Sequence, residues 1–337
     1  MIKTGSQKTI MPNATTLPLS KEMLISIIIC THNPNVRLLN EVLDALRNQT
    51  LATETWELLI IDNASGKPVD KSIDVAWHQQ MRIVHEAKLG LTNARVRGIL
   101  ESQGELLIFV DDDNLLDKDY LQKCLDIANQ HSNLGAWGGN LVPRYEVPPP
   151  HWFHQFAHLL AIRTIANDKW CNIPEWSIGA CPSGAGMCIR RTVAKKYVEI
   201  CTLDPLREIL DRTGTCLMGY GDLDMAFTSC DMGMGTGVFA RLSLTHVIPR
   251  TRIEKSYLLK LEEGNAASSV VMDFIRGKLK VNQTTTVPKS LLAKIHGKVK
   301  SIFTNADKSV SLNQDFTVAR AKGSLIGHSI INKHINS

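Results

Sequence analysis

Three consecutive carboxylates stand in the stretch Phe109-Val110-Asp111-Asp112-Asp113-Asn114, directly after the apolar run 106–110. A short apolar run bounded by polar residues is typical of a buried strand, so the acids lie where a strand ends. Open parallel sheets bind ligands at the carboxyl ends of their strands. Clustered carboxylates repel one another unless a cation lies among them, and Mg²⁺ or Mn²⁺ shares such ligands with substrate phosphates. The stretch predicts a divalent metal that holds a diphosphate; the plainer alternative is a solvated acidic turn that caps the next helix.

The chain around these acids alternates between strand and helix patterns. Apolar or β-branched runs at 24–30, 56–61, 81–85 and 105–110 predict strands, and apolar spacing predicts a helix over 36–48. Thr92 and Asp117 are expected to cap two further helices. Strands separated by helices predict an α/β fold with a mostly parallel sheet and helices on both faces. Right-handed crossovers then bring Thr31, Asp62 and Asp111 to one edge of the sheet.

The composition is that of a globular protein: 337 residues, 44% hydrophobic and 21% charged. No segment approaches the ~20 apolar residues that span a bilayer. Residues 1–20 are polar and lack the apolar core of a secretory signal, so a cytoplasmic protein is expected. The eight cysteines form no C-x-x-C pair and are interpreted as free thiols. His154 and His158 have the spacing of zinc ligands, but no Glu follows His154, and we reject a zinc site there.

The formal net charge of +5 is unevenly distributed along the chain. Residues 251–337 hold 14 Lys and Arg against 6 Asp and Glu, so the rest of the chain is slightly acidic. This argues against nucleic acid as a partner. Apolar residues recur at helical spacing over 291–303 with lysines between them, which predicts a basic amphipathic helix. Such a helix lies on an anionic membrane surface, at the inner face of the cell membrane, or packs on the rest of the protein.

A set of short motifs, in this order, resembles the family 2 glycosyltransferases with the GT-A fold. The resemblance covers residues 24–257, about two thirds of the chain. The motifs are the segments 27–33, 59–63, 90–98, 109–113, 184–191, 221–224 and 244–249. The resemblance implies a GT-A domain at 23–264. The polar composition before it predicts a disordered tail at 1–22, and the basic, helically spaced sequence after it predicts a basic helical region at 265–337. Within the domain, 23–142 would bind the nucleotide and 143–264 the acceptor.

The resemblance also implies roles for single residues. Asp222 would be the catalytic base. Asp224 would be the second candidate for that role and a substrate-binding residue. Asp113 and His246 would hold Mn²⁺ or Mg²⁺. The remaining substrate-binding residues would be Thr31 and Asp62 at the nucleotide base, Arg95 and Arg252 at the phosphates, Asp111 and Asp112 at the ribose or metal, and Gly184 in a side-chain-free wall. The family usually has Glu-Asp where this chain has Gly221-Asp222, which removes one acid of a pair.

The function expected from these residues is an inverting, metal-dependent glycosyltransferase that takes a sugar from a UDP-sugar. Its acceptor would be a glycan or a lipid-linked molecule in the synthesis of a cell-surface polysaccharide or glycoconjugate. Two alternatives stay open, a catalytically silent sugar-nucleotide-binding protein of the same fold and a sugar-phosphate nucleotidyltransferase. The second class needs a Gly-rich basic loop after the first strand, where this chain has Thr31-His32-Asn33-Pro34.

Overall fold

The computed structural model describes residues 23–279 and 308–336. The expected tail at 1–22 and the expected amphipathic segment 291–303 lie outside the described residues. Among the residues that the structure describes, no helix is both long enough and apolar enough to cross a membrane.

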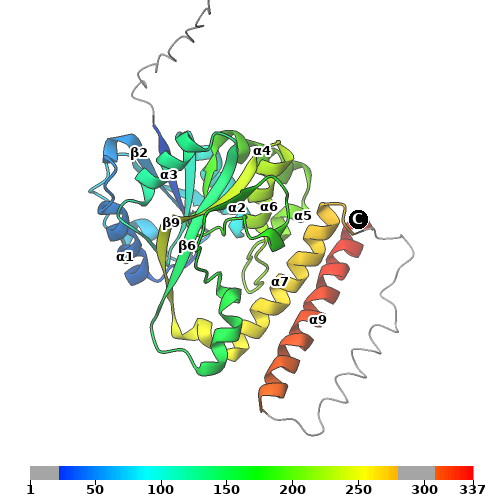
Figure 1. The fold of residues 1–337 in the computed structure, drawn as a ribbon. Coiled ribbons are helices and arrows are strands. Elements are labelled where there is room, and N and C mark those ends of the chain that lie inside the picture. The colour runs from blue at the N-terminus through cyan, green and yellow to red at the C-terminus, as the bar shows by residue number, and fades with distance from the viewer. Residues whose placement is uncertain (1–22, 280–307, 337) are drawn as a thin grey trace, which may run out of the picture.

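A nine-stranded mixed sheet forms the centre of the molecule (Figure 1). Its first half is parallel, as predicted, in the order β3 (Met81–Glu86), β2 (Trp56–Asn63), β1 (Ile25–Thr31) and β4 (Leu106–Asp111). The second half begins at β8 (Cys188–Arg190), which is antiparallel to β4 and to β6 (Leu134–Tyr145). It continues through β9 (Gly235–Ile248), which runs parallel to β6 and also pairs antiparallel with β5 (Asn114–Leu116) and β7 (Lys169–Cys171).

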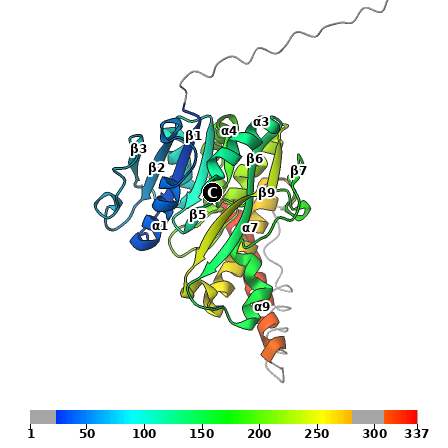
Figure 2. The same ribbon diagram turned by 60° about the vertical axis from the view of Figure 1, so that its left-hand side comes forward.

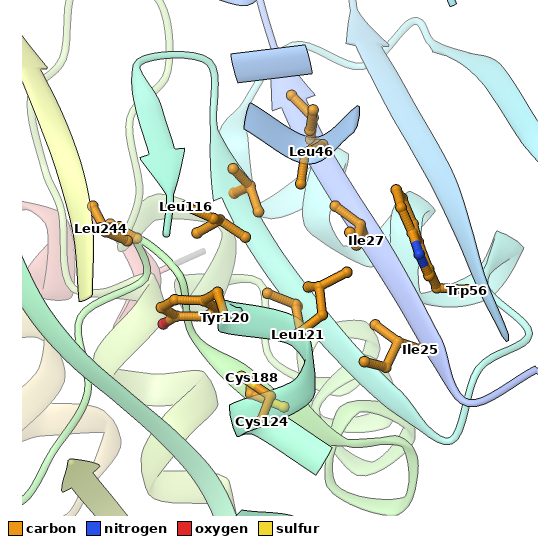
Figure 3. Packing of buried hydrophobic residues seen from close by; sticks show 14 of the residues in the cluster. Ile25, Ile27, Leu46, Trp56, Leu116, Tyr120, Leu121, Cys124, Cys188 and Leu244 are labelled. Atoms are coloured by element: carbon orange, nitrogen blue, oxygen red, sulfur yellow. The ribbon is translucent and has the colours of Figure 1, made fainter. Parts of the chain in front are cut away.

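Helices cover both faces of the sheet because successive strand residues point to opposite sides. Ile25, Ile27 and Ile29 of β1 pack in one cluster with α1 (Val36–Arg47) and α3 (Tyr120–Gln130), and Figure 3 shows part of this cluster. Ile28 faces the other cluster, which also receives apolar residues of several helices. Among these helices are α2 (Leu91–Glu101), α4 (Arg191–Leu203), α6 (Gly221–Asp231) and α7 (Lys255–Ile275).

Two expected helix caps differ in the structure. α2 begins after Gly90, whose φ of 139° is a value that glycine adopts more easily than other residues. Thr92 lies inside the first turn, and its hydroxyl donates to Asp211 and does not cap the helix. α3 begins after Asp119 rather than Asp117, and Asp119 makes no side-chain capping bond. In contrast, Asn35 caps α1 as a good N-cap residue does, because its side chain accepts from the N–H groups of Arg37 and Leu38.

The chain ends in a pair of long helices, α7 and α9 (Lys308–Ile335), which lie side by side at one end of the sheet (Figures 1 and 2). Glycines let them approach closely: a Cβ at Gly323 would lie 2.0 Å from the carbonyl oxygen of Glu263. A third apolar cluster ties the pair to the 3₁₀ segment His151–Leu160, where the rings of Phe156 and Phe316 stack. The expected boundary after residue 264 falls inside α7, so this helix belongs to both of the expected regions.

Candidate active site

A cavity of about 870 Å³ opens at the carboxyl ends of the parallel strands. The strand register places Thr31 beside Asp62 and Cys30 beside Asp111, so the three predicted residues do reach one edge of the sheet. Nine of the predicted site residues line the cavity: Thr31, Arg95, Asp111, Asp112, Asp113, Gly184, Asp222, His246 and Arg252. The cavity volume lies within the range of small-molecule sites.

Asp113 is held by two basic side chains from the far half of the sheet. β5 pairs Asn114 with His246 of β9, and this brings His246 Nε2 to 3.7 Å from Asp113 Oδ2. Arg252, in the turn after β9, places Nη1 2.6 Å from the same oxygen. Burial opposes ionisation of Asp113, but Arg252 and His246 outweigh it and lower its pKa to about 2. Asp113 is therefore a fixed anion of the site.

The other two acids of the stretch behave differently from Asp113. Asp112 accepts a hydrogen bond of 2.5 Å from the Thr31 hydroxyl. Burial, followed by the charge of Asp113, raises the pKa of Asp112 to about 6. The pKa of Asp111 is also raised, by burial and then by Asp113. Three adjacent carboxylates thus carry a repulsion that a bound cation would relieve.

Asp113 and His246 both line the cavity, with Oδ2 and Nε2 3.7 Å apart, and this pair could hold a metal ion. Across the described part of the chain, no three His, Cys, Asp or Glu side chains are grouped closely enough to form a complete metal site. Mg²⁺ usually keeps several waters and binds one or two carboxylates together with substrate phosphates. A pair of donors beside a cavity therefore fits an ion shared with a ligand, not an ion enclosed by protein alone.

Asp222 lies in the first turn of α6 and lines the cavity. Its Oδ2 accepts from the Gly184 N–H at 2.6 Å, and its Oδ1 accepts from the Leu223 N–H at 2.8 Å. Burial raises the pKa of Asp222, Arg95 opposes this rise, and Asp211 adds to it. Gly184 is needed for the close approach, because a Cβ there would lie 2.9 Å from the Asp222 Cβ. Asp222 thus combines fixed orientation with raised basicity.

Asp211 is a site residue that the sequence analysis missed. It lies in the loop between α5 (Leu206–Ile209) and α6, lines the cavity, and is only 3% exposed. Its Oδ2 accepts from Arg95 Nη1 at 2.7 Å and from the Thr92 hydroxyl at 3.1 Å. The turn residues Asp211-Arg212-Thr213-Gly214 are a sequence signal for a loop. Nothing in them indicated that this loop would cover α2.

Two predicted substrate-binding residues do not line the cavity. The Asp62 carboxylate closes the turn after β2, where it accepts from the N–H groups of Ser65 and Val69, both at 3.3 Å. Asp224 is fully buried and does not line the cavity. Arg207 Nη1 lies 2.5 and 2.6 Å from its two oxygens, and Arg276 Nη2 lies 3.4 Å from one of them. The expected substrate contact of Asp224 is therefore wrong, because its charge is already paired within the protein.

The C-terminal helices form part of the cavity wall. α7 contributes Glu262, Asn265 and Ser269, and α9 contributes Arg320 and Ser324. Arg320 Nε lies 2.5 Å from Glu262 Oε1 and links the two helices. The site therefore extends beyond the region where the sequence analysis placed the acceptor half.

Known proteins are similar in sequence to part of this chain. Residues 26–197 match the family model for glycosyl transferase family 2. EpsH of Bacillus subtilis is 27% identical over 115 residues, which cover 33% of this chain and 32% of that protein. The glucosyl-dolichyl phosphate glucuronosyltransferase of Haloferax volcanii is 22% identical over 134 residues, which cover 39% of this chain and 42% of the relative. The chain thus spans less than half the length of these curated relatives.

Solved structures include one of S. aureus TarS, with a TM-score of 0.49 and 13% identity over 91% of this chain and 55% of that one. The family match begins in β1 and ends in α4, and so includes the acidic stretch 111–113 and the Gly184 wall. Since that match takes in more than half of the residues, the chain belongs to glycosyl transferase family 2 and has the GT-A fold.

Proposed function

We propose that this protein is an inverting, metal-dependent glycosyltransferase that moves a sugar from UDP to a hydroxyl group of a glycan or lipid-linked acceptor. The observation that carries the proposal is that one cavity is lined both by Asp222 of α6 and by the Asp113 group, which consists of Asp113, His246 and Arg252. A direct displacement at an anomeric carbon needs one base for the incoming hydroxyl and one electrophilic group for the leaving diphosphate. A single displacement of this kind inverts the anomeric configuration.

The diphosphate is assigned to the Asp113 group. Asp113 and His246 would hold the metal, and Arg252 and Arg212 bring two guanidinium groups to the same cavity. Guanidinium groups match the geometry of phosphate oxygens. A divalent ion bound there would act as a Lewis acid that neutralises charge on the departing nucleoside diphosphate. The cationic side chains would bind the same oxygens and keep the leaving group in place.

The nucleoside is assigned to the end of the cavity that follows β1 and β2. Thr31, His32, Asn63 and Leu89 line this end. Asp62 Oδ1 accepts one backbone hydrogen bond and retains a lone pair that a uracil N–H could use, while Oδ2 accepts from the Val69 N–H and lies 3.4 Å from His85 Nδ1. Because Asp62 is 1% exposed, this contact requires the turn over 64–69 to move when the nucleotide binds. Preference for UDP therefore depends on this movement.

Asp222 is assigned the role of the base. Its raised pKa brings it closer to the working pH, where a general base is most effective. The two backbone N–H groups that bind its oxygens fix the carboxylate toward the cavity. The side chain would accept the proton of the acceptor hydroxyl as the new glycosidic bond forms.

The acceptor is assigned to the wall formed by α7, α9 and Trp176. Trp176 lines the cavity and is 50% exposed, and an exposed indole ring can stack on a sugar face. Asn265, Ser269 and Ser324 offer neutral hydrogen-bonding groups to sugar hydroxyls. The basic segment 291–303 would bring the enzyme to anionic lipid at the inner face of the membrane, where a lipid-linked acceptor for a surface glycan would lie.

A donor screen tests the proposal. We expect UDP with Mn²⁺ to raise the melting temperature of the protein more than ADP, GDP or CDP does, and we expect Asp113→Ala to abolish the rise. Release of UDP from UDP-sugars in water then separates an active enzyme from a silent binding protein, the alternative raised by the missing acid at Gly221. A shift of equal size for all nucleotides, or a shift without metal, would contradict the donor assignment.

Flotation with anionic vesicles tests whether the protein binds a membrane surface. Lys→Glu changes over 289–300 should abolish this binding.

A further inference from the structure

Gly221 leaves a space beside Asp222 that a carboxylate from another segment fills. A Cβ built on Gly221 would lie 2.1 Å from Oδ2 and 2.4 Å from Cγ of Asp211. The second distance is close to that between Cβ and the carboxyl carbon within a glutamate side chain. Asp211 therefore places its carboxyl group near the position that a glutamate at 221 would give it.

Asp211 also organises the groups that hold Asp222. Its partner Arg95 is 5% exposed and donates through Nη1 at 2.7 Å. Nη2 of the same guanidinium lies against Gly184, 2.7 Å from the position of a Cβ there. The Gly184 N–H in turn donates to Asp222 Oδ2 at 2.6 Å. A continuous series of contacts thus leads from Asp211 through Arg95 and Gly184 to Asp222.

The plainer explanation is an ion pair between Asp211 and Arg95 that serves only stability. A buried ion pair is weak support for stability, because desolvation offsets much of the attraction between its charges. The pair also lies at the cavity, since Asp211, Arg95, Gly184 and Asp222 all line it. These two facts favour a role in the reaction over a purely structural one.

We propose that Asp211 is a positioning residue of the transfer reaction: from the loop before α6 it supplies the second carboxylate that Gly221 leaves out, and it fixes Arg95 and Gly184 around Asp222. The proposal rests on the assignment of Asp222 as the base. It implies that the Gly221-Asp222 pair keeps full function because its missing acid is provided elsewhere in the chain.

The charge of Asp211 also acts on the proton affinity of Asp222. Burial and Asp211 raise the pKa of Asp222, and Arg95 lowers it. The titratable and charged groups that act on Asp222 come from several segments: Arg95, Asp211, Arg163, Cys181 and Tyr220. Loss of the Asp211 charge removes a negative charge that raises the pKa of Asp222, and it leaves the positive charge of Arg95 without its partner. Both effects lower the pKa of Asp222.

A carboxylate exchange tests the proposal with three variants: Asp211→Gly, Gly221→Glu and the two combined. Each single change should lower the rate of UDP release from a panel of UDP-sugars with Mn²⁺ by about hundredfold, since a small displacement of catalytic groups costs that much. The first removes the carboxylate, and the second forces it against the new side chain. The combined variant should recover to within about tenfold of wild type. A folded combined variant that stays as slow as Asp211→Gly would overturn the proposal.

Asp211→Asn provides a second test, because it should change the pH dependence of kcat/KM, which would stay the same if Asp211 had only a structural role. The amide keeps the shape of the side chain and an acceptor for Arg95, but it removes the charge. We expect the acid limb of the kcat/KM profile against pH to shift to lower pH, and an unshifted limb would overturn the proposal. Wild-type protein and Asp222→Asn are the controls. If wild type releases no UDP, the proposed function itself fails; if wild type is active and Asp222→Asn is not, only the role of Asp211 is at stake.

Discussion

Arg252 Nη1 lies 2.6 Å from Asp113 Oδ2, so the carboxylate proposed to hold the metal already has a cation of its own chain. The same oxygen lies 3.7 Å from His246 Nε2. A guanidinium and a metal ion compete for such an oxygen unless the guanidinium turns toward a phosphate. Binding of the metal and binding of the diphosphate should therefore depend on each other.

Replacement of Arg252 by Gln should raise the affinity for Mn²⁺ in the absence of nucleotide. A neighbouring arginine stabilises a charged carboxylate by an amount that corresponds to one to three pKa units. Because Arg252 competes with the metal for Asp113, its removal should raise the affinity for Mn²⁺ by about tenfold. Affinity for UDP with Mn²⁺ should fall, because a phosphate contact is lost. Calorimetric titration with Mn²⁺ alone and with UDP measures both. Arg250→Gln is the matched control, because Arg250 is exposed and does not line the cavity. Unchanged Mn²⁺ affinity in Arg252→Gln would refute the competition.

Asp112→Asn should stabilise the unliganded protein at alkaline pH and leave it nearly unchanged near pH 4. The folded pKa of Asp112 is raised to about 6, so its neutral form stabilises the fold at low pH. That contribution is lost as the pH rises through 6 and Asp112 ionises beside Asp113. We expect a gain of about 1–3 kcal/mol at pH 8. Urea unfolding at the two pH values measures it, with the exposed Asp44→Asn as control. A gain of equal size at pH 4 would argue against repulsion as the cause.

Asp224→Asn should destabilise the protein without weakening its hold on the donor. Asp224 is fully buried between Arg207 and Arg276, and loss of one charge from such a group costs about 3–5 kcal/mol. Asp231 pairs with the same Arg276 but is 48% exposed, so Asp231→Asn should cost at most about 1 kcal/mol. Denaturant unfolding compares the two variants. A higher KM for the donor in folded Asp224→Asn would contradict this prediction, because it would indicate that Asp224 contacts the substrate.

Gly323→Leu should separate α9 from α7 and damage the acceptor wall. A side chain there meets the backbone of Glu263, and overpacking of this kind costs about 1–3 kcal/mol. UDP with Mn²⁺ should still raise the melting temperature, because the nucleotide end is built by other elements. Transfer to an acceptor should fall more than UDP release in water. Ser329→Leu, at an exposed position of α9, is the control and should leave both reactions unchanged. An equal loss of both reactions would place the damage in the donor site instead.

The sequence predicted those parts of the site that depend on strand ends. Thr31, Asp111 and Asp113 follow directly from apolar runs and from the rule that ligands bind at the carboxyl edge of a parallel sheet. The same rule brought Asp62 to that edge. It could not tell that the backbone of Ser65 and Val69 would use its oxygens, because a turn conformation decides that.

The features that the sequence did not predict depend on contacts between distant segments. Asp211 meets Arg95 across 116 residues of chain, and Asp224 meets Arg276 across 52. Neither pairing leaves a local pattern, so an acid in a first helical turn looked as available at 224 as at 222. The contribution of α9 to the cavity was hidden for the same reason, since residues 276–307 separate it from α7.

The central claim is that Asp222 removes the proton of the incoming hydroxyl while the Asp113 group holds the leaving diphosphate. Asp222→Asn keeps the size of the side chain and loses the base, so it separates binding from chemistry. The most direct test measures the UDP-sugar turnover of this variant together with its Kd for UDP and Mn²⁺. We predict a loss of turnover of about 10²–10⁴-fold with an unchanged Kd. Turnover within a few-fold of wild type at the same Kd would contradict the account.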